Sequence, residues 1–275
     1  MMEANLLVAI VALLFGLVIG SFLNVCIHRW PRGRSVVRPR SHCVRCRKTI
    51  AWYDNIPLLS YILLGGKCRH CGRRISIRYP LVELGAGLLS FYFVLTMGPT
   101  AAALKMCVFT AILVALVFCD LEKRILPDEL TLGGALAGFA FAFFVPVPDI
   151  TAQALLWFLG FDVSGQAQWL AEAALGSLLP ALFLWGGGWL YQKIRHREGL
   201  GLGDVKLIVM VGAFLGLRGA LLTLILGSVA GSIVGYAYIK LTHRDAATYE
   251  LPFGTFLGLA GLVVALFGPK LTGAM

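Results

Sequence analysis

The sequence predicts an all-α polytopic membrane protein with about eight transmembrane helices and a small cytosolic, zinc-ribbon-like insertion between helices 1 and 2. Two observations predict this fold class. Hydrophobic residues make up 59% of the 275 residues and charged residues only 14%, with a mean hydropathy of +0.82, whereas soluble domains are about half apolar and about a quarter charged. The apolar residues also come in runs of about 18 or more, the length that crosses a bilayer.

Apolar runs along the chain give the candidate spans. They lie at 5–27, 81–97, 101–119, 129–145, 169–192, 204–217, 219–240 and 251–268. The first has no basic residue before it and no small-x-small cleavage site, so we expect a retained span rather than a signal peptide. The run at 204–217 is short and is expected to tilt or to extend through the glycines before it. The apolar segment 151–159 is too short to span and is expected along the outer interface.

Basic residues indicate the orientation. The loop 28–80 carries thirteen Lys and Arg residues against one acid, Asp54. Loops rich in Lys and Arg beside spans are the cytosolic ones, so eight crossings place both the N-terminus and the C-terminus outside, on the side opposite the cytosol. The net charge of +10 does not indicate nucleic-acid binding, because these basic residues are expected to meet anionic lipids of the inner leaflet.

Four cysteines in this loop form two CxxC pairs, Cys43 with Cys46 and Cys68 with Cys71, separated by 21 residues. This spacing is typical of a zinc ribbon, in which four thiolates surround one metal. Such a closed site is structural, because no position stays open for water. The alternative is four unliganded thiols. We therefore expect three parts: the first span at 1–27, a cysteine module at 28–80, and a membrane bundle at 81–275.

Two aspartates lie where apolar runs meet loops. Asp120 ends one run and Asp204 begins another, after Gly199, Gly201 and Gly203. Two complete crossings separate the aspartates, so both lie at the cytosolic boundary and can meet if the third and sixth spans pack together. Two carboxyl groups that share a proton can divide the work of a peptidase, since one activates water and the other polarises the scissile carbonyl. A helix-end anion and a proton relay are the alternatives.

Several stretches resemble the bacterial type IV prepilin peptidases. Gly201-Leu-Gly-Asp204 matches the GxGD signature of intramembrane aspartyl proteases, and the stretch from Asp120 to Asp128 is similar to the first-aspartate motif of the prepilin peptidases. The string from Gly20 to Pro31 and the region from Cys43 to Glu83 match the same family. The likeness covers nearly the whole chain, in the same order.

The resemblance implies a bifunctional enzyme of the bacterial inner membrane. Asp120 and Asp204 would be the catalytic pair, and the four cysteines the zinc ligands. The substrates would be type IV prepilins or type II secretion pseudopilins, cleaved on the cytosolic side and then methylated at the new N-terminus with S-adenosylmethionine. The resemblance places methylation in the first span and the cysteine module. Glu83 is a candidate for binding cofactor or amine, or alternatively a first-turn anion favoured by the helix dipole.

Two functions of other classes stay open. In a transporter or proton-coupled channel, Asp120 and Asp204 would form an ion relay, and Asp→Asn changes would impair flux. In a non-catalytic scaffold, the cysteine module would bind a partner and both aspartates would be dispensable. A signal-peptide-peptidase-like enzyme fits less well, because the cysteine module and the string from Gly20 to Pro31 are not expected there.

Overall fold

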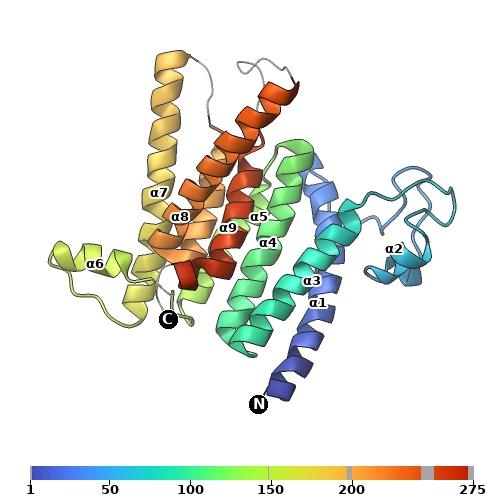
Figure 1. The fold of residues 1–275 in the computed structure, drawn as a ribbon, viewed down its shortest axis with the longest axis horizontal. Helices are drawn as coiled ribbons and strands as arrows, with labels where there is room; N and C mark the ends of the chain where they lie inside the picture. The colour runs from blue at the N-terminus through green and yellow to red at the C-terminus, as the bar shows by residue number, and fades with distance from the viewer. Residues whose placement is uncertain (1, 148, 197–199, 243–250, 272–275) are drawn as a thin grey trace. The chain divides into compact units, whose positions relative to one another are not determined.

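The computed structural model describes residues 2–147, 149–196, 200–242 and 251–271. Its helices are α1 (Met2–Arg29), α2 (Leu59–Leu63), α3 (Arg78–Met97), α4 (Ala101–Lys123), α5 (Asp128–Ala142), α6 (Thr151–Phe158), α7 (Gln166–Arg195), α8 (Leu202–Thr242) and α9 (Phe253–Leu271) (Figure 1). Over the described residues there is no strand, only isolated β-bridges in the cysteine module. The chain forms two compact units, Met1–Phe118 and Cys119–Met275.

Within the parts of the chain that the structure describes, five helices are long and apolar enough to cross a membrane, namely α1, α3, α4, α7 and α8. The helix α9 is apolar but shorter, and α5 has 15 residues. Large apolar side chains are exposed along these helices, for example Phe15 on α1, Leu136 on α5 and Phe183 on α7. In a bilayer such side chains meet lipid tails, which are as apolar as they are. The prediction of a helical protein with several membrane spans is thereby confirmed.

In the first unit, α1 and α3 run antiparallel with their backbones in contact. A Cβ atom at Gly16 would lie 2.7 Å from a carbonyl oxygen of α3, and one at Gly20 would lie 2.6 Å from Cα of Glu83. No side chain fits at either position, which is the close packing that small residues four apart allow in membranes. Near the end of this contact, Asn24 Nδ2 donates a hydrogen bond to the Tyr79 carbonyl at 3.0 Å.

The start of the cysteine module is organised by Arg29, the last residue of α1. Its guanidinium is buried and donates hydrogen bonds to the carbonyl oxygens of Ser35, Val36 and Pro39 at 3.0, 3.2 and 2.7 Å. A buried charge needs such partners, because an unpaired one is strongly disfavoured. Arg29 is thus one basic residue of the loop that serves the fold rather than a lipid headgroup.

In the second unit, α8 consists of two helical segments that join at Gly216. This residue has φ 77° and ψ −173°, outside the helical region. Both ends of α8 lie near the start of α9. At the beginning of α8, Asp204 Oδ1 would lie 3.1 Å from a Cβ atom at Gly254. Toward the end of α8, a Cβ atom at Gly235 would overlap the Leu251 side chain. The chain therefore reverses at Gly216, and its two segments correspond to two of the predicted spans.

One carboxylate holds this turn. Asp149 is buried, and its Oδ1 accepts hydrogen bonds from the backbone N–H and the hydroxyl of Thr151, at 3.0 and 2.6 Å, where α6 begins. Its Oδ2 accepts one from the backbone N–H of Arg218 at 2.7 Å, where the second segment of α8 begins. The first N–H groups of a helix have no acceptor within the helix, so Asp149 caps two helix starts at once.

We expect Asp149→Ala to destabilise the second unit by about 2–4 kcal/mol, because the N–H groups at both helix starts lose their acceptor. Asp149→Asn keeps one oxygen acceptor and should have a smaller effect. Thermal unfolding of the protein in nanodiscs measures both. Asp162→Ala is the matched control, because Asp162 is an exposed carboxylate of the same connecting segment. Equal loss of thermal stability in the Asp149 and Asp162 variants would contradict the capping role.

Candidate functional site

The two CxxC pairs form turns of the same geometry in the first unit. In each turn the N–H of the first cysteine, Cys43 or Cys68, donates to the carbonyl five residues later. The N–H four residues later donates back to the carbonyl of that cysteine, and all four bonds measure 2.9 Å. The donor of the second bond has a positive φ in both turns, 58° at Arg47 and 66° at Gly72. Each turn thus brings two thiols to one side of the chain.

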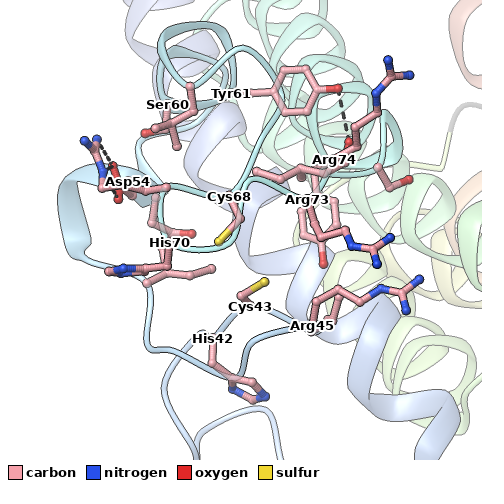
Figure 2. A pocket seen from close by; sticks show the side chains of 18 of the residues that line it. His42, Cys43, Arg45, Asp54, Ser60, Tyr61, Cys68, His70, Arg73 and Arg74 are labelled. Carbon is pink, nitrogen blue, oxygen red and sulfur yellow. Dashed lines mark hydrogen bonds and ion pairs between the residues drawn. The ribbon is translucent and has the colours of Figure 1, made fainter.

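The four thiols converge on one point. The Sγ atoms of Cys43, Cys46, Cys68 and Cys71 all lie within 4.8 Å of one another, and those of Cys43 and Cys71 are 3.9 Å apart. A tetrahedral zinc with Zn–S bonds of about 2.3 Å requires S···S distances of roughly 3.8 Å. Figure 2 shows Cys43 and Cys68 pointing toward each other and His42 pointing away. The four sulfurs fit one tetrahedral metal.

Contacts within the cluster change the proton affinities of the thiols. Burial raises the pKa of Cys43, but backbone N–H groups of Cys46 and Arg45 and the neighbouring thiols lower it by more, to about 7. The backbone N–H of Arg73 lowers the pKa of Cys71, whereas burial and the other three thiols raise it by more, to about 11. A bound metal requires the thiolates, so metal binding must displace the proton that the raised pKa keeps on Cys71.

A cavity of about 340 Å³ lies between the cysteine turns and the beginning of α3. Its lining includes the hydroxyl groups of Ser60 and Tyr61 and the side chain of Glu83. Figure 2 shows the guanidinium groups of Arg73 and Arg74, which also line the cavity, directed to one side of it. Sites for small ligands span about 300–1,000 Å³. The cavity therefore has the volume and the mixed charge of a small-ligand site.

Glu83 joins α1, α3 and the cysteine module. It is buried, and its Oε2 accepts a hydrogen bond from the backbone N–H of Leu58 at 2.9 Å. Ser21 of α1 hydrogen-bonds to the same carboxylate. Leu58 has φ 59° and ψ −48°, a conformation that costs a non-glycine residue free energy. Because α3 begins at Arg78, Glu83 lies past the first turn, and the alternative of a first-turn anion does not describe it.

Asp120 and Asp204 come together in the second unit, on either side of Gly254. Asp120 lies in the last turn of α4 and Asp204 in the first turn of α8. A Cβ atom at Gly254 would lie 3.2 Å from Asp120 Cγ and 3.1 Å from Asp204 Oδ1. The distance between Asp120 Cγ and Asp204 Oδ1 therefore cannot exceed the sum of these two distances. Asp120 is buried and Asp204 half-buried. The two predicted residues thus form a paired-aspartate site.

Thr255 fixes the orientation of Asp120, and sequence reasoning missed it. Its backbone N–H and its hydroxyl both donate to Asp120 Oδ2, at 2.6 and 2.7 Å. Thr255 and Gly254 lie in an apolar run near the beginning of α9, where no charge or motif singles them out. The proline before them, Pro252, is the one local signal of a helix start.

Leucine and glycine residues form the wall of the paired-aspartate site. A Cβ atom at Gly254 would lie 2.9 Å from Leu126 Cδ1, and one at Gly203 would lie 3.2 Å from Leu126 Cβ. A Cβ atom at Gly201 would lie 3.4 Å from Asp204 Oδ2. Of the glycines before Asp204, Gly203 thus permits a close approach to Leu126, whereas Gly201 has room for an ordinary contact and Gly199 lies outside the described residues.

The fold and these clusters define a helical membrane protein with a paired-aspartate site in one compact unit and a four-thiol module in the other. Two family models match the sequence. The bacterial peptidase A24 N-terminal domain matches residues 14–97, which include the four cysteines, and the type IV leader peptidase family matches residues 107–236, which include both aspartates. The chain belongs to the type IV leader peptidase family, as its motifs predict.

Similar curated proteins carry the name prepilin leader peptidase/N-methyltransferase. One from Aeromonas salmonicida (strain A449) is 36% identical, over 94% of this chain and 90% of its own length. One from Pseudomonas aeruginosa is 35% identical, over 94% and 90%. One from Myxococcus xanthus (strain DK1622) is 43% identical, over 89% of this chain and 67% of its own length. No solved structure matches the chain.

Proposed function

We propose that this protein cleaves the leader peptides of type IV prepilins or type II secretion pseudopilins and then methylates the new N-terminal residue. The similar proteins named above are prepilin leader peptidases and N-methyltransferases, and the chain covers most of their length. The observation that carries the proposal is the convergence of Asp120 and Asp204 beside Gly254, from helices far apart in the sequence.

Peptide cleavage by two carboxyl groups requires one ionised and one protonated group. We assign the base to Asp120, because both donors of Thr255 meet its Oδ2 and stabilise negative charge there. Asp120 takes a proton from the attacking water, while protonated Asp204 donates a hydrogen bond to the scissile carbonyl oxygen. The tetrahedral intermediate then loses the amine, which leaves with a proton from the pair, and the leader ends in a new carboxyl group.

The four cysteines hold one structural zinc ion in this proposal. Their sulfur distances suit tetrahedral coordination, and a four-sulfur site leaves no coordination position for substrate. Binding of the metal supplies folding free energy to a module of about 50 residues whose own core is small. The zinc ion thus shapes the cavity next to it.

The cavity beside the zinc site is the place proposed for S-adenosylmethionine. When bound, this cofactor supplies an electrophilic methyl group. It carries cationic groups and a carboxylate. The cavity offers the carboxylate of Glu83 as a partner for the cationic groups, and guanidinium groups such as those of Arg73 and Arg74 as partners for the carboxylate. The first span and the cysteine module, residues 1–80, together with Glu83 of α3, would then serve methylation, and the rest of the bundle at 81–275 peptide cleavage.

Glu83→Gln is expected to weaken S-adenosylmethionine binding by about tenfold or more, because it removes a charge partner worth about 1.5–3 kcal/mol. Cleavage of the leader should be unchanged. Titration calorimetry of the zinc-loaded protein measures the binding. Glu129→Gln, an exposed acid at the start of α5, serves as control. Unchanged affinity in the Glu83 variant would place the methyl donor elsewhere.

Eight crossings are proposed for the chain, with both termini in the periplasm and the paired-aspartate site at the cytosolic boundary of the inner membrane. The helices α1, α3, α4, α5, α7 and α9 each cross once, and α8 crosses twice because it reverses at Gly216. The thirteen basic residues of 28–80 against one acid support a cytosolic cysteine module. Those that are exposed are proposed to contact anionic lipids, and no nucleic-acid partner is proposed.

Mass spectrometry of a prepilin incubated with the protein tests both activities in one sample. We expect loss of the leader mass without S-adenosylmethionine, and loss of the leader with gain of one methyl group when the cofactor is added. An uncleaved prepilin in the presence of folded, zinc-containing protein would overturn the proposal.

Gly254→Ala is expected to slow leader cleavage by about 10–100-fold, since small misplacements of reacting groups have effects of that size. The added methyl group forces the carboxyl groups and Leu126 to move by a few tenths of an ångström. Initial cleavage rates measure the effect. Gly268→Ala is the control on the same helix, because its Cβ atom would make ordinary contact with Val264 at 3.5 Å. Wild-type rates in the Gly254 variant, or equal losses in both, would contradict the geometry.

A further inference from the structure

The segment 52–64 of the cysteine module buries the hydroxyl of Ser60 and exposes most of its large apolar side chains. It comprises the 3-10 turn Trp52–Asn55 and α2. The hydroxyl of Ser60 is buried, accepts a hydrogen bond from the Ile56 N–H at 3.0 Å and donates one to the Tyr53 carbonyl at 2.8 Å. These bonds tie the turn to α2, so the segment presents a defined outer face.

The outer face of this segment is apolar. Its most exposed side chains are those of Trp52 (75%), Ile62 (71%) and Leu63 (75%), with Leu59 at 49% and Ile56 at 39%. Soluble surfaces rarely gather so many large apolar side chains in one place, and such a patch marks an interaction site. An aromatic residue beside aliphatic ones is the composition of elements that lie in the membrane interface.

The segment lies level with the first turns of a membrane span. The hydrogen bond from Leu58 N–H to Glu83 Oε2, at 2.9 Å, ties the residue before α2 to α3. The cysteine module also continues directly into candidate spans at both of its ends, α1 and α3. In the proposed topology the module is therefore held at the membrane surface.

The surroundings of the segment are positively charged. Lys67 lies directly beside the end of α2, since its N–H donates to the Leu64 carbonyl at 3.1 Å, and the exposed Arg69 contacts Asp54 of the segment. The single acid of the module, Asp54, is held by the Arg69 guanidinium through contacts of 2.6 to 3.1 Å, and this hydrogen bonding lowers the pKa of Asp54. Lys67 and Arg69, here called the basic rim, stand beside the apolar face and complement the anionic headgroups of the cytosolic leaflet.

We propose that the segment 52–64 inserts its outer face into the cytosolic leaflet and anchors the cysteine module there. Leu59, Ile62 and Leu63 enter the boundary between headgroups and acyl chains, and Trp52 lies at headgroup level. The basic rim contacts lipid phosphates. This inference rests on the proposed topology and not on either catalytic activity, so its failure would leave the peptidase proposal intact. Lipid is favoured over a pilin segment or a second copy because the rim matches headgroup charge and both ends of the module are membrane spans.

Photo-crosslinking tests the insertion. Leu63→p-benzoylphenylalanine and, separately, Leu59→p-benzoylphenylalanine are introduced into the full-length protein, which is placed in nanodiscs of phosphatidylethanolamine and phosphatidylglycerol and irradiated. Mass spectrometry then counts lipid adducts. The same replacement at Leu88, an exposed side chain in the middle of α3, gives the level for full lipid contact. The same replacement at Val37, an exposed apolar side chain elsewhere in the module, gives the level for no insertion.

We expect lipid adducts at positions 59 and 63 to exceed those at position 37 by at least fivefold and to approach those at position 88. Adducts at 59 and 63 as scarce as at 37, while 88 reacts, would overturn the proposal. Adducts that form with added prepilin, or with a second copy of the chain, in place of lipid would overturn it as well and assign the surface to that partner. Zinc content confirms that each variant keeps its folded module.

Discussion

Asp120→Asn and Asp204→Asn will each lower the rate of leader cleavage by at least about a thousandfold, the scale of loss when one member of a catalytic unit is removed. Neither amide can act as the base that takes a proton from water, nor supply the proton of a carboxylic acid. Initial rates of prepilin cleavage measure the effect. Zinc content, thermal unfolding and methylation of a peptide that lacks its leader should stay at wild-type levels, since none of them requires the aspartate pair.

Asp128→Asn is the matched control for this pair. Asp128 is an exposed carboxylate at the start of α5 that forms an ion pair with Lys206 at 2.7 Å, so its loss should change cleavage little. More than a tenth of wild-type cleavage in either Asp120→Asn or Asp204→Asn would contradict the peptidase assignment. An ion relay would show a different pattern, with proton flux across vesicles reduced and cleavage unaffected.

Cys43→Ser combined with Cys46→Ser will remove the bound metal, from about one zinc per chain to none, because two ligands cannot hold a structural zinc site. Zinc binding in small modules is worth about 10–16 kcal/mol, so the module should lose its fold. Elemental analysis measures zinc, and limited proteolysis measures the exposure of residues 28–80. Methylation should fall at least tenfold, because the cavity lies against the cysteine turns.

Cys107→Ser provides the control for thiol chemistry in general. Cys107 lies in α4, half-buried and outside the four-thiol cluster, and its replacement should leave zinc content and proteolysis unchanged. A wild-type protein that is fully folded and active without metal would contradict the structural role of the four cysteines. So would a double variant that keeps its zinc.

The features that the sequence predicts well are those carried by charge, spacing or long apolar runs. Runs of apolar residues predict the long helices, because a bilayer selects for length and hydropathy. The CxxC spacing predicts the thiol cluster, because a tight turn converts spacing directly into distance. An even number of crossings between Asp120 and Asp204 predicts only that both lie at one boundary and can meet, and the structure adds that they converge at Gly254.

The features that the sequence does not predict depend on tertiary contacts between residues without charge or motif. Thr255 carries a common hydroxyl in an apolar run, and only its contact with Asp120 gives it a role. The double cap by Asp149 requires that α6 and the second half of α8 start at the same place. The exposure of the apolar side chains of 52–64 is not predicted from the sequence, because exposure is a property of the folded module.

The bond between Thr255 and Asp120 joins residues 135 positions apart, and this has a consequence for biosynthesis. At about 5–20 residues per second, a ribosome reaches Thr255 roughly 7 to 27 seconds after Asp120. A nascent chain that already contains both aspartates still lacks the donors that orient the first of them. If Asp120 is the base proposed above, hydrolytic competence is expected to arrive only with the insertion of α9, and chains that lack α9 are expected to be inert toward prepilins.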